Sequence, residues 1–284
     1  MARTRAIRTV HTVAELRAQV RQWRAAGERV ALVPTMGALH AGHVALMTEG
    51  RKLAEHIVVS IFVNPTQFAP TEDLSRYPKT LEADLDKAET AGVELAFVPD
   101  ATEMYPPGFV TTISMAGPAL GLETDFRPTH FAGVATVVAK LLIQAQPDIA
   151  LFGEKDYQQL QVITQLARDL DLPVQIIGVP TVREADGLAL SSRNVYLGQE
   201  DRAAAPALHR ALSAAAAAIK RGGAIANSVD AARAHVTKAG FHIDYLEARH
   251  AVTLAPVSSV EDGPVRLLVA AKIGATRLID NLAV

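Results

Sequence analysis

The stretch Thr35-Met-Gly-Ala-Leu-His-Ala-Gly-His43 decides how the rest of the chain is interpreted. It follows an apolar run, residues 30–34, that is typical of a buried parallel strand, and it leads into residues 44–53, which have the pattern of a helix. A strand, a glycine-bearing turn and a helix N-terminus form a site suited to phosphate, because unpaired backbone N–H groups and the positive end of the helix dipole point the same way. The stretch therefore predicts an α/β fold with an anion at this turn.

This turn differs from the two common phosphate-binding loops. It lacks the G-x-G-x-x-G pattern of dinucleotide-binding folds, and His43 stands where a P-loop has lysine after the glycine pair Gly37 and Gly42. It carries instead two imidazoles, His40 and His43, which fall on one side of the first helical turn.

Three interpretations of the histidine pair stay open on local grounds. The histidines cap the helix or lie in solvent, or they bind zinc, or they donate hydrogen bonds to charge on a transferring phosphoryl group. Zinc needs further ligands, and the chain has no Cys and no His-Glu-x-x-His. The strand–turn–helix context favours the phosphoryl group.

The composition is that of a globular protein with a large core. The chain has 284 residues, which suggests two domains, and 49% of them are hydrophobic against 20% charged. A net charge of −2 gives no indication of nucleic acid as a partner, and the absence of Cys excludes disulfides, iron–sulfur clusters and thiol nucleophiles.

No segment of the sequence has the pattern of a membrane anchor. Residues 1–8 are basic but lack the apolar region of a secretory signal, and the longest charge-free stretch, 104–122, is broken by prolines and glycines. We therefore expect no membrane association and a cytoplasmic location.

Alternating apolar runs and amphipathic segments predict a Rossmann-like parallel sheet with helices, followed by a smaller α+β domain. We place the two domains at 1–181 and 182–284. In the first we expect helices at 13–26, 81–91 and 134–144, strands at 30–34, 56–63, 93–98, 149–152 and 174–179, and a short strand at 110–114. In the second we expect helices near 201–221 and 229–239 and strands at 243–247, 265–271 and 276–280.

Further candidates follow the ends of predicted strands, where open α/β sheets bind ligands. Asn64 and Gln67 follow one strand, although Asn-Pro can also be an ordinary turn. The turn 153–156 holds Lys155, which is either a phosphate contact or a surface lysine between two carboxylates. The polar loop 190–194 suits either a phosphate clamp or an inter-domain linker. The acidic residues 82, 84 and 86 form either a solvated helix face or a holder for Mg²⁺.

Four motifs together resemble the pantothenate synthetase (pantoate–β-alanine ligase) family. They are Pro34–His43, Phe62–Phe68, Gly153–Gln159 and Asp186–Asn194, and they occur in order over nearly the full chain, with residues 276–281 added at its end. The histidine motif alone marks only the wider nucleotidyltransferase superfamily. There the loop 190–194 resembles the Lys-Met-Ser-Lys-Ser signature, but Ala189 replaces its first lysine, so Lys155 and Arg193 would take over one phosphate contact.

The resemblance implies a ligase that makes pantothenate from pantoate, β-alanine and Mg-ATP through a pantoyl adenylate, releasing pyrophosphate and AMP. It implies catalytic roles for His40, His43, Lys155 and Arg193, and a homodimer. It implies pantoate or β-alanine contacts from Thr35, Asn64, Gln67 and Gln159, and a Mg²⁺ contact from Asp84. The implied ATP contacts are Met36, Gly37, Ala38, Leu39, His40, Ala41, Gly42, His43, Gly153, Glu154, Lys155, Asp156, Val182, Leu190, Ser191, Ser192 and Arg193.

Two other functions remain as alternatives. One is a nucleotidyltransferase of the same fold that acts on a different substrate. The other is a nucleotide-binding regulator with a degenerate site, which the complete motif set disfavours.

Overall fold

The chain forms two compact units in the computed structural model, which describes residues 6–68 and 74–284. The first unit runs to residue 115 and also contains 127–154 and 162–180, whereas the second contains 116–126, 155–161 and 181–284. The final crossing at residue 181 lies beside the boundary predicted from sequence. Two short segments of the predicted first domain, 116–126 and 155–161, belong instead to the second unit.

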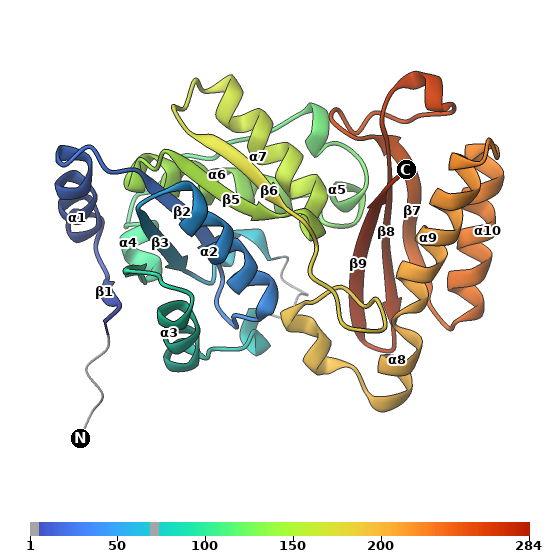
Figure 1. Cartoon of the computed structure of the whole chain (residues 1–284), viewed down its shortest axis with the longest axis horizontal. Coiled ribbons are helices and arrows are strands. Elements are labelled where there is room, and N and C mark those ends of the chain that lie inside the picture. Colours follow the sequence, from blue (N-terminus) through green and yellow to red (C-terminus); the bar gives the residue numbers. More distant parts are fainter. Residues whose placement is uncertain (1–5, 69–73) are drawn as a thin grey trace. The chain divides into compact units, whose positions relative to one another are not determined.

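A six-stranded, fully parallel sheet is the centre of the first unit (Figure 1). Its order is β1-β4-β3-β2-β5-β6. The strands are β1 (Arg8–Val10), β2 (Val30–Thr35), β3 (His56–Ile61), β4 (Leu95–Phe97), β5 (Ile149–Gly153) and β6 (Gln175–Val179). The predicted Rossmann-like fold is confirmed. Strand β1 was not predicted, because three residues are too few for a periodic pattern.

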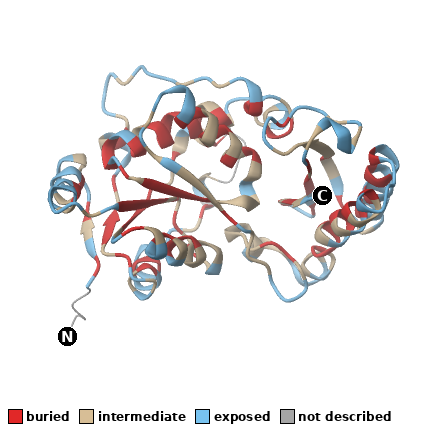
Figure 2. Ribbon diagram, turned by 45° about the horizontal axis from the view of Figure 1, so that its top comes forward, coloured by how far each residue is buried: buried red, intermediate tan, exposed pale blue. Residues whose placement is uncertain are grey.

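Helices lie on both sides of this sheet, and its strands are largely buried (Figure 2). Helices α2 (Ala41–Leu53) and α3 (Leu81–Thr90) share a core with the sheet that includes Val33, Met47, Ile57 and Leu85. Helices α1 (Val13–Ala25) and α6 (His130–Ala145) contact each other and β2. Further helices along this part of the chain are α4 (Ala101–Met104), α5 (Glu123–Phe126) and α7 (Tyr157–Asp169).

The strand order creates a switch point between β2 and β5. From β2 the chain continues to β3 and β4 on one side, whereas β5 and β6 lie on the other side. Strands β2 and β5 are neighbours, with Ala31 opposite Ile149 and Leu32 opposite Ala150. Since both are parallel, the turns that begin at Met36 and Gly153 leave the same edge of the sheet, where ligands bind in this class of fold.

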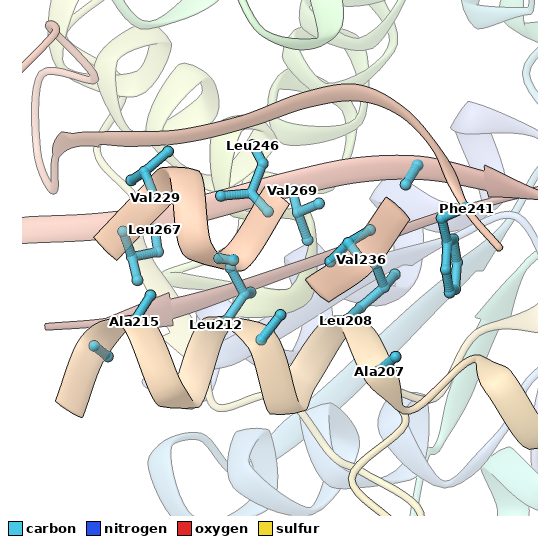
Figure 3. Close-up of a cluster of buried hydrophobic side chains, with 14 of the residues drawn as sticks. Ala207, Leu208, Leu212, Ala215, Val229, Val236, Phe241, Leu246, Leu267 and Val269 are labelled. Atoms are coloured by element: carbon cyan, nitrogen blue, oxygen red, sulfur yellow. The ribbon is translucent and has the colours of Figure 1, made fainter. Parts of the chain in front are cut away.

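The second unit contains a three-stranded antiparallel sheet and a helical layer. Strands β7 (His242–His250), β8 (Val265–Ile273) and β9 (Thr276–Ala283) pair in that order. Helices α9 (Ala207–Lys220) and α10 (Ile225–Lys238) supply the other half of the core. In Figure 3 Leu208 and Leu212 of α9, Val236 of α10, and Leu246 and Val269 of the sheet belong to this apolar cluster.

Two predicted elements were wrong in detail. The predicted helix 201–221 is two helices, α8 (Gln199–Ala204) and α9, because Pro206 has no N–H to continue the first helix. The predicted strand 110–114 is not part of a sheet, and Ile113 N donates to Thr136 Oγ1 instead of to a neighbouring strand. Within 6–68 and 74–284, no helix has the length and apolar character required to cross a membrane.

Candidate active site

The turn after β2 has a left-handed backbone at two consecutive residues. Gly37 has φ 83° and Ala38 has φ 50°. The Thr35 hydroxyl accepts from Gly37 N at 3.2 Å and donates to Ser60 O at 2.8 Å. A Cβ at Gly37 would lie 3.2 Å from Asp84 Oδ2, so glycine serves both the conformation and the close approach. The predicted substrate contact of Thr35 stays a prediction, and its hydroxyl already shapes the turn.

Asp84, on α3, stabilises this turn by accepting hydrogen bonds from its main chain. It is 1% exposed, and its carboxylate accepts from Ala38 N at 2.9 Å and Leu39 N at 2.7 Å. Thr80 Oγ1 adds a third hydrogen bond at 3.1 Å. Glu82 and Asp86 on the same helix are exposed. The interpretation of the acidic cluster as a solvated face is therefore wrong for Asp84.

The geometry of Asp84 also bears on the predicted Mg²⁺ contact. Both carboxylate oxygens already accept hydrogen bonds from the protein, so they are poorly suited to a cation that prefers rigid octahedral oxygen coordination. Among the side chains described, no three His, Cys, Asp or Glu residues gather into a group that could hold a metal ion. The carboxylate fits the role of an acceptor that shapes the turn.

His40 and His43 form a reciprocal cap at the start of α2. His40 Nδ1 accepts from Gly42 N at 3.1 Å, and His43 Nδ1 accepts from His40 N at 3.2 Å. Their ring centroids are 4.2 Å apart. Because each Nδ1 accepts from a backbone N–H, the proton of each neutral ring is on Nε2. Capping and donation are thus compatible, since one nitrogen of each ring caps the helix and the other is a donor.

Gln67 lies in the short 3₁₀ turn Pro65–Gln67 after β3, and the buried Asn64 determines how its amide is oriented. Asn64 Oδ1 accepts from Thr66 N, and Asn64 Nδ2 donates to Gly133 O, so the amide assignment of Asn64 follows from two backbone partners. Asn64 Nδ2 also donates to Gln67 Oε1 at 3.0 Å. Gln67 Nε2 is therefore the donor of this amide, and it donates to Met36 Sδ at 3.1 Å.

Both polar atoms of the Asn64 side chain form hydrogen bonds within the protein. Besides these contacts, its Oδ1 accepts from Tyr105 OH at 2.8 Å, and burial raises the pKa of that tyrosine above its ordinary value. With 1% exposure and both amide atoms engaged, Asn64 positions Gln67. The predicted direct contact of Asn64 with substrate stays a prediction.

Helix α6 and the residues before it hold the main chain of the Gln67 turn. His130 Nδ1 lies 3.0 Å from Gln67 O, and Arg127 Nη2 donates to the same oxygen at 3.3 Å. A Cβ at Gly133 would lie 2.4 Å from Thr66 O, so only glycine allows α6 to approach the turn this closely. None of these three residues was predicted, because each lies 60 or more positions away from the turn in sequence.

Lys155, with the first turn of α7, belongs to the second unit. Its Nζ lies 3.7 Å from Asp156 Oδ1, and its side chain is 18% exposed against 49% for the aspartate. Asn281 Nδ2, on β9, donates to Lys155 O at 2.9 Å. Lys155 is therefore half-buried and held through its main chain, which differs from the alternative of a solvated surface lysine.

The polar loop 190–194, predicted as a phosphate clamp or an inter-domain linker, follows a tight hairpin in the second unit. Leu190 N donates to Val182 O at 3.0 Å across the Asp186-Gly187 turn. Arg183 donates to both carboxylate oxygens of Asp280 on β9, at 2.7 and 2.8 Å. Asp280 is 4% exposed, so this is a buried, bidentate ion pair. The ion pair connects Arg183, at the start of this hairpin, to β9.

A second buried ionic cluster secures residues 116–126 to this unit. Arg277 donates to both oxygens of Glu123 at 2.8 and 2.9 Å and to Asp244 at 2.7 Å. Burial lowers the pKa of the Arg277 guanidinium, but the two carboxylates outweigh burial and raise it overall. Burial also raises the pKa of Tyr245, whose hydroxyl donates to Glu123.

The predicted site residues thus fall into two groups. The first unit contains Thr35–His43, Asn64, Gln67, Asp84, Gly153 and Glu154. The second unit contains Lys155, Asp156, Gln159, Val182 and Leu190–Arg193. The residues that hold these side chains in place were not predicted from sequence; they are Arg127, His130, Gly133, Arg183 and Asp280. Of these, only Asp280 lies in a segment that the sequence singled out, residues 276–281.

Comparison with known proteins gives a consistent set of relatives. The sequence profile of the family described as pantoate-beta-alanine ligase matches residues 8–283. A pantothenate synthetase of Bradyrhizobium sp. (strain BTAi1 / ATCC BAA-1182) is 56% identical over 282 residues, covering 99% of this chain and 100% of that protein. One from Rhodopseudomonas palustris (strain BisA53) is 58% identical over 96% of this chain and 97% of that protein.

Two solved structures are also similar over their full length. The crystal structure of pantothenate synthetase from Thermus thermophilus has a TM-score of 0.92 at 50% identity, covering 97% of this chain and 99% of that one. The pantoate-beta-alanine ligase from Francisella tularensis, crystallised with beta-gamma ATP and beta-alanine, has a TM-score of 0.82 at 32% identity and covers 98% of each chain.

Proposed function

The chain belongs to the pantoate–beta-alanine ligase family, and from that premise we propose how its residues join pantoate to β-alanine. The predicted family, enzyme class and overall reaction are confirmed. In the proposed sequence a pantoate carboxylate oxygen attacks the α-phosphorus of ATP, and pyrophosphate leaves. The β-alanine amine then attacks the acyl carbon of the pantoyl adenylate, losing a proton, and AMP leaves as pantothenate forms.

The observation that carries the ATP assignment is the pair of imidazoles at the switch point. With each Nδ1 engaged by a backbone N–H, His40 and His43 present Nε2–H groups at the N-terminus of α2, where the helix dipole also favours anions. We assign these donors to the charge that develops on the α-phosphoryl group. Lys155 and Arg193 supply positive charge for the phosphates, and Met36–Gly42, Gly153–Asp156, Val182 and Leu190–Ser192 supply the surrounding contacts.

Gln67 is assigned to pantoate. Its Oε1 accepts from Asn64 and one hydrogen of Nε2 is donated to Met36 Sδ, and we assign the other Nε2 hydrogen to an oxygen of the substrate. Gln159, half-buried in the first turns of α7, is assigned to pantoate as a second amide. Two amides suit a small acid with hydroxyl groups, because such a substrate has several oxygens to hold and one carboxylate to present.

ATP enters as its Mg²⁺ complex in this proposal. The cation supplies screening of the phosphate charge, as it does in other phosphoryl-transfer enzymes, where it keeps several waters and few protein ligands. Asp84 acts on the turn rather than on the metal, since its oxygens accept from Ala38 N, Leu39 N and Thr80 Oγ1. We further propose that the enzyme is cytoplasmic and forms a homodimer. Light scattering at several concentrations measures its molar mass and so tests the homodimer.

Pantoate-dependent exchange of labelled pyrophosphate into ATP tests the proposed first step. We expect exchange only when pantoate and Mg²⁺ are present, and AMP release only when β-alanine is added. Exchange that ignores pantoate would instead support a nucleotidyltransferase for another substrate. Binding of ATP and pantoate in a calorimeter, without pyrophosphate over hours, would support a nucleotide-binding regulator.

A further inference from the structure

The segment 155–161 is held by the second unit at several independent points. Asn281 donates to Lys155 O, and Tyr157 OH donates to Ala251 O at 2.9 Å. The guanidinium of Arg266 lies 4.0 Å from the centre of the Tyr157 ring. Gln158 Nε2 donates to Pro118 O and Gly121 O, each at 3.1 Å. These contacts explain why α7 begins in one unit and continues in the other.

Asn281 is the contact that reaches the functional residue itself. It is 3% exposed on β9, and Arg266 Nε donates to its Oδ1 at 2.8 Å. Because Arg266 can only donate and Lys155 O can only accept, the two partners determine the orientation of the Asn281 amide. An aspartate of the same shape would keep the bond to Arg266, yet its second oxygen would face Lys155 O and repel it.

We propose that Asn281 is a positioning residue for Lys155, acting through the Lys155 carbonyl with Arg266 behind it. The inference rests on the proposed role of Lys155 at the phosphates. A buried hydrogen bond to the main chain fixes the point from which the lysine side chain starts, and a flexible four-carbon side chain places its charge reproducibly only from a fixed base. The main chain of Lys155 is therefore attached to β9, the strand that also binds Arg183 through Asp280.

The first experiment compares Asn281→Asp and Asn281→Ala with the wild type in pantoate-dependent pyrophosphate exchange. We expect kcat to fall roughly 10- to 100-fold in both, as for a misplaced catalytic group, while the KM for pantoate stays close to the wild-type value. Asn227→Asp, an exposed change of the same kind on α10, is the matched control and should leave kcat unchanged. A proportional rise in the KM for pantoate with unchanged kcat would overturn the proposal.

A double-mutant cycle separates positioning from general structural damage. In a Lys155→Ala background, Asn281→Ala should change the remaining exchange rate by less than about two-fold, because the residue it positions is gone. The same loss in both backgrounds would show a purely structural role and overturn the proposal while leaving the proposed function intact. Wild-type activity in Lys155→Ala itself would overturn both this proposal and the assigned role of Lys155.

Discussion

The two glycine-marked turns at the switch point are held by different kinds of interaction. The turn 36–43 is held within the first unit, by its own imidazoles and by the Asp84 carboxylate on α3. The segment that begins at Lys155 is held from the opposite end of the chain, by Asn281 on β9. The comparison teaches that one fold can hold one glycine turn by its own capping side chains and a helix of the same unit, and the segment after the next by a strand near the end of the chain.

We expect the largest effect from two substitutions that compare the turn 36–43 with the turn 153–156 in catalysis. His43→Ala and Lys155→Ala should each lower the exchange rate by at least about 100-fold, the loss measured when one charge-stabilising donor is removed. Lys52→Ala, a 65% exposed lysine on α2, is the control. Near-normal turnover in either variant would remove that residue from the proposed chemistry.

The Gln67 amide gives a sharper test of how local hydrogen bonds set recognition. Gln67→Glu keeps the bond from Asn64 but replaces the Nε2 donor with a carboxylate oxygen, so the KM for pantoate at pH 8 should rise roughly 10-fold or more. Gln175→Glu, exposed on β6, is the control. An unchanged KM at pH 8 would show that Gln67 accepts instead.

Asp84→Asn tests whether the first turn depends on one buried carboxylate. One backbone N–H would then face an amide NH₂ group, and the free energy of unfolding should fall by about 1.5–3 kcal/mol. Denaturant unfolding measures it. The Mg²⁺ concentration for half-maximal activity should stay the same, and a large increase in it would return Asp84 to the role of metal ligand.

Gly133→Ala tests the close approach of α6 to the Gln67 turn. The added methyl would lie 2.4 Å from Thr66 O, so either helix or turn must move, at a cost of about 1–3 kcal/mol in the free energy of unfolding. The KM for pantoate should rise with it, because the turn carries Gln67. Gly198→Ala meets no atom within 4 Å and serves as the control. Equal stability of the two variants would contradict the expected clash.

The smallest effect concerns His209, beside the Arg183–Asp280 ion pair. Burial and the Arg183 charge lower the pKa of His209 below 6.5, so its contribution to stability is present above that pH and is lost as the pH falls through the lowered value. His209→Gln lacks this loss. The Tm of the wild type minus the Tm of the variant should therefore decrease from pH 7.5 to pH 5.5. A constant value of this difference would contradict the expectation.

Features that follow from nearby residues could be predicted, whereas those made by distant residues could not. The alternation of β-branched runs and amphipathic segments predicts the parallel sheet, and Thr35–His43 predicts the glycine turn and helix start after β2. The role of Asp84 was missed because it depends on which face of α3 meets the turn, and an acidic residue among other acids usually lies in solvent. The breaks at Pro206 and the unpaired segment 110–114 show the limits of periodicity.

The sequence by itself determined most of the order of the elements and the two glycine turns, because each depends on residues close together in the chain. The reaction followed from the resemblance of four motifs to a known family. Only the tertiary structure decided what holds these motifs in place. Arg127, Gly133 and Asn281 act across 60 to 126 positions, and their partners are backbone atoms that have no signature in a sequence. The residues of a single turn can therefore be identified from their spacing in the sequence. The contacts that hold such a turn in place depend on packing between segments that meet only in the folded chain.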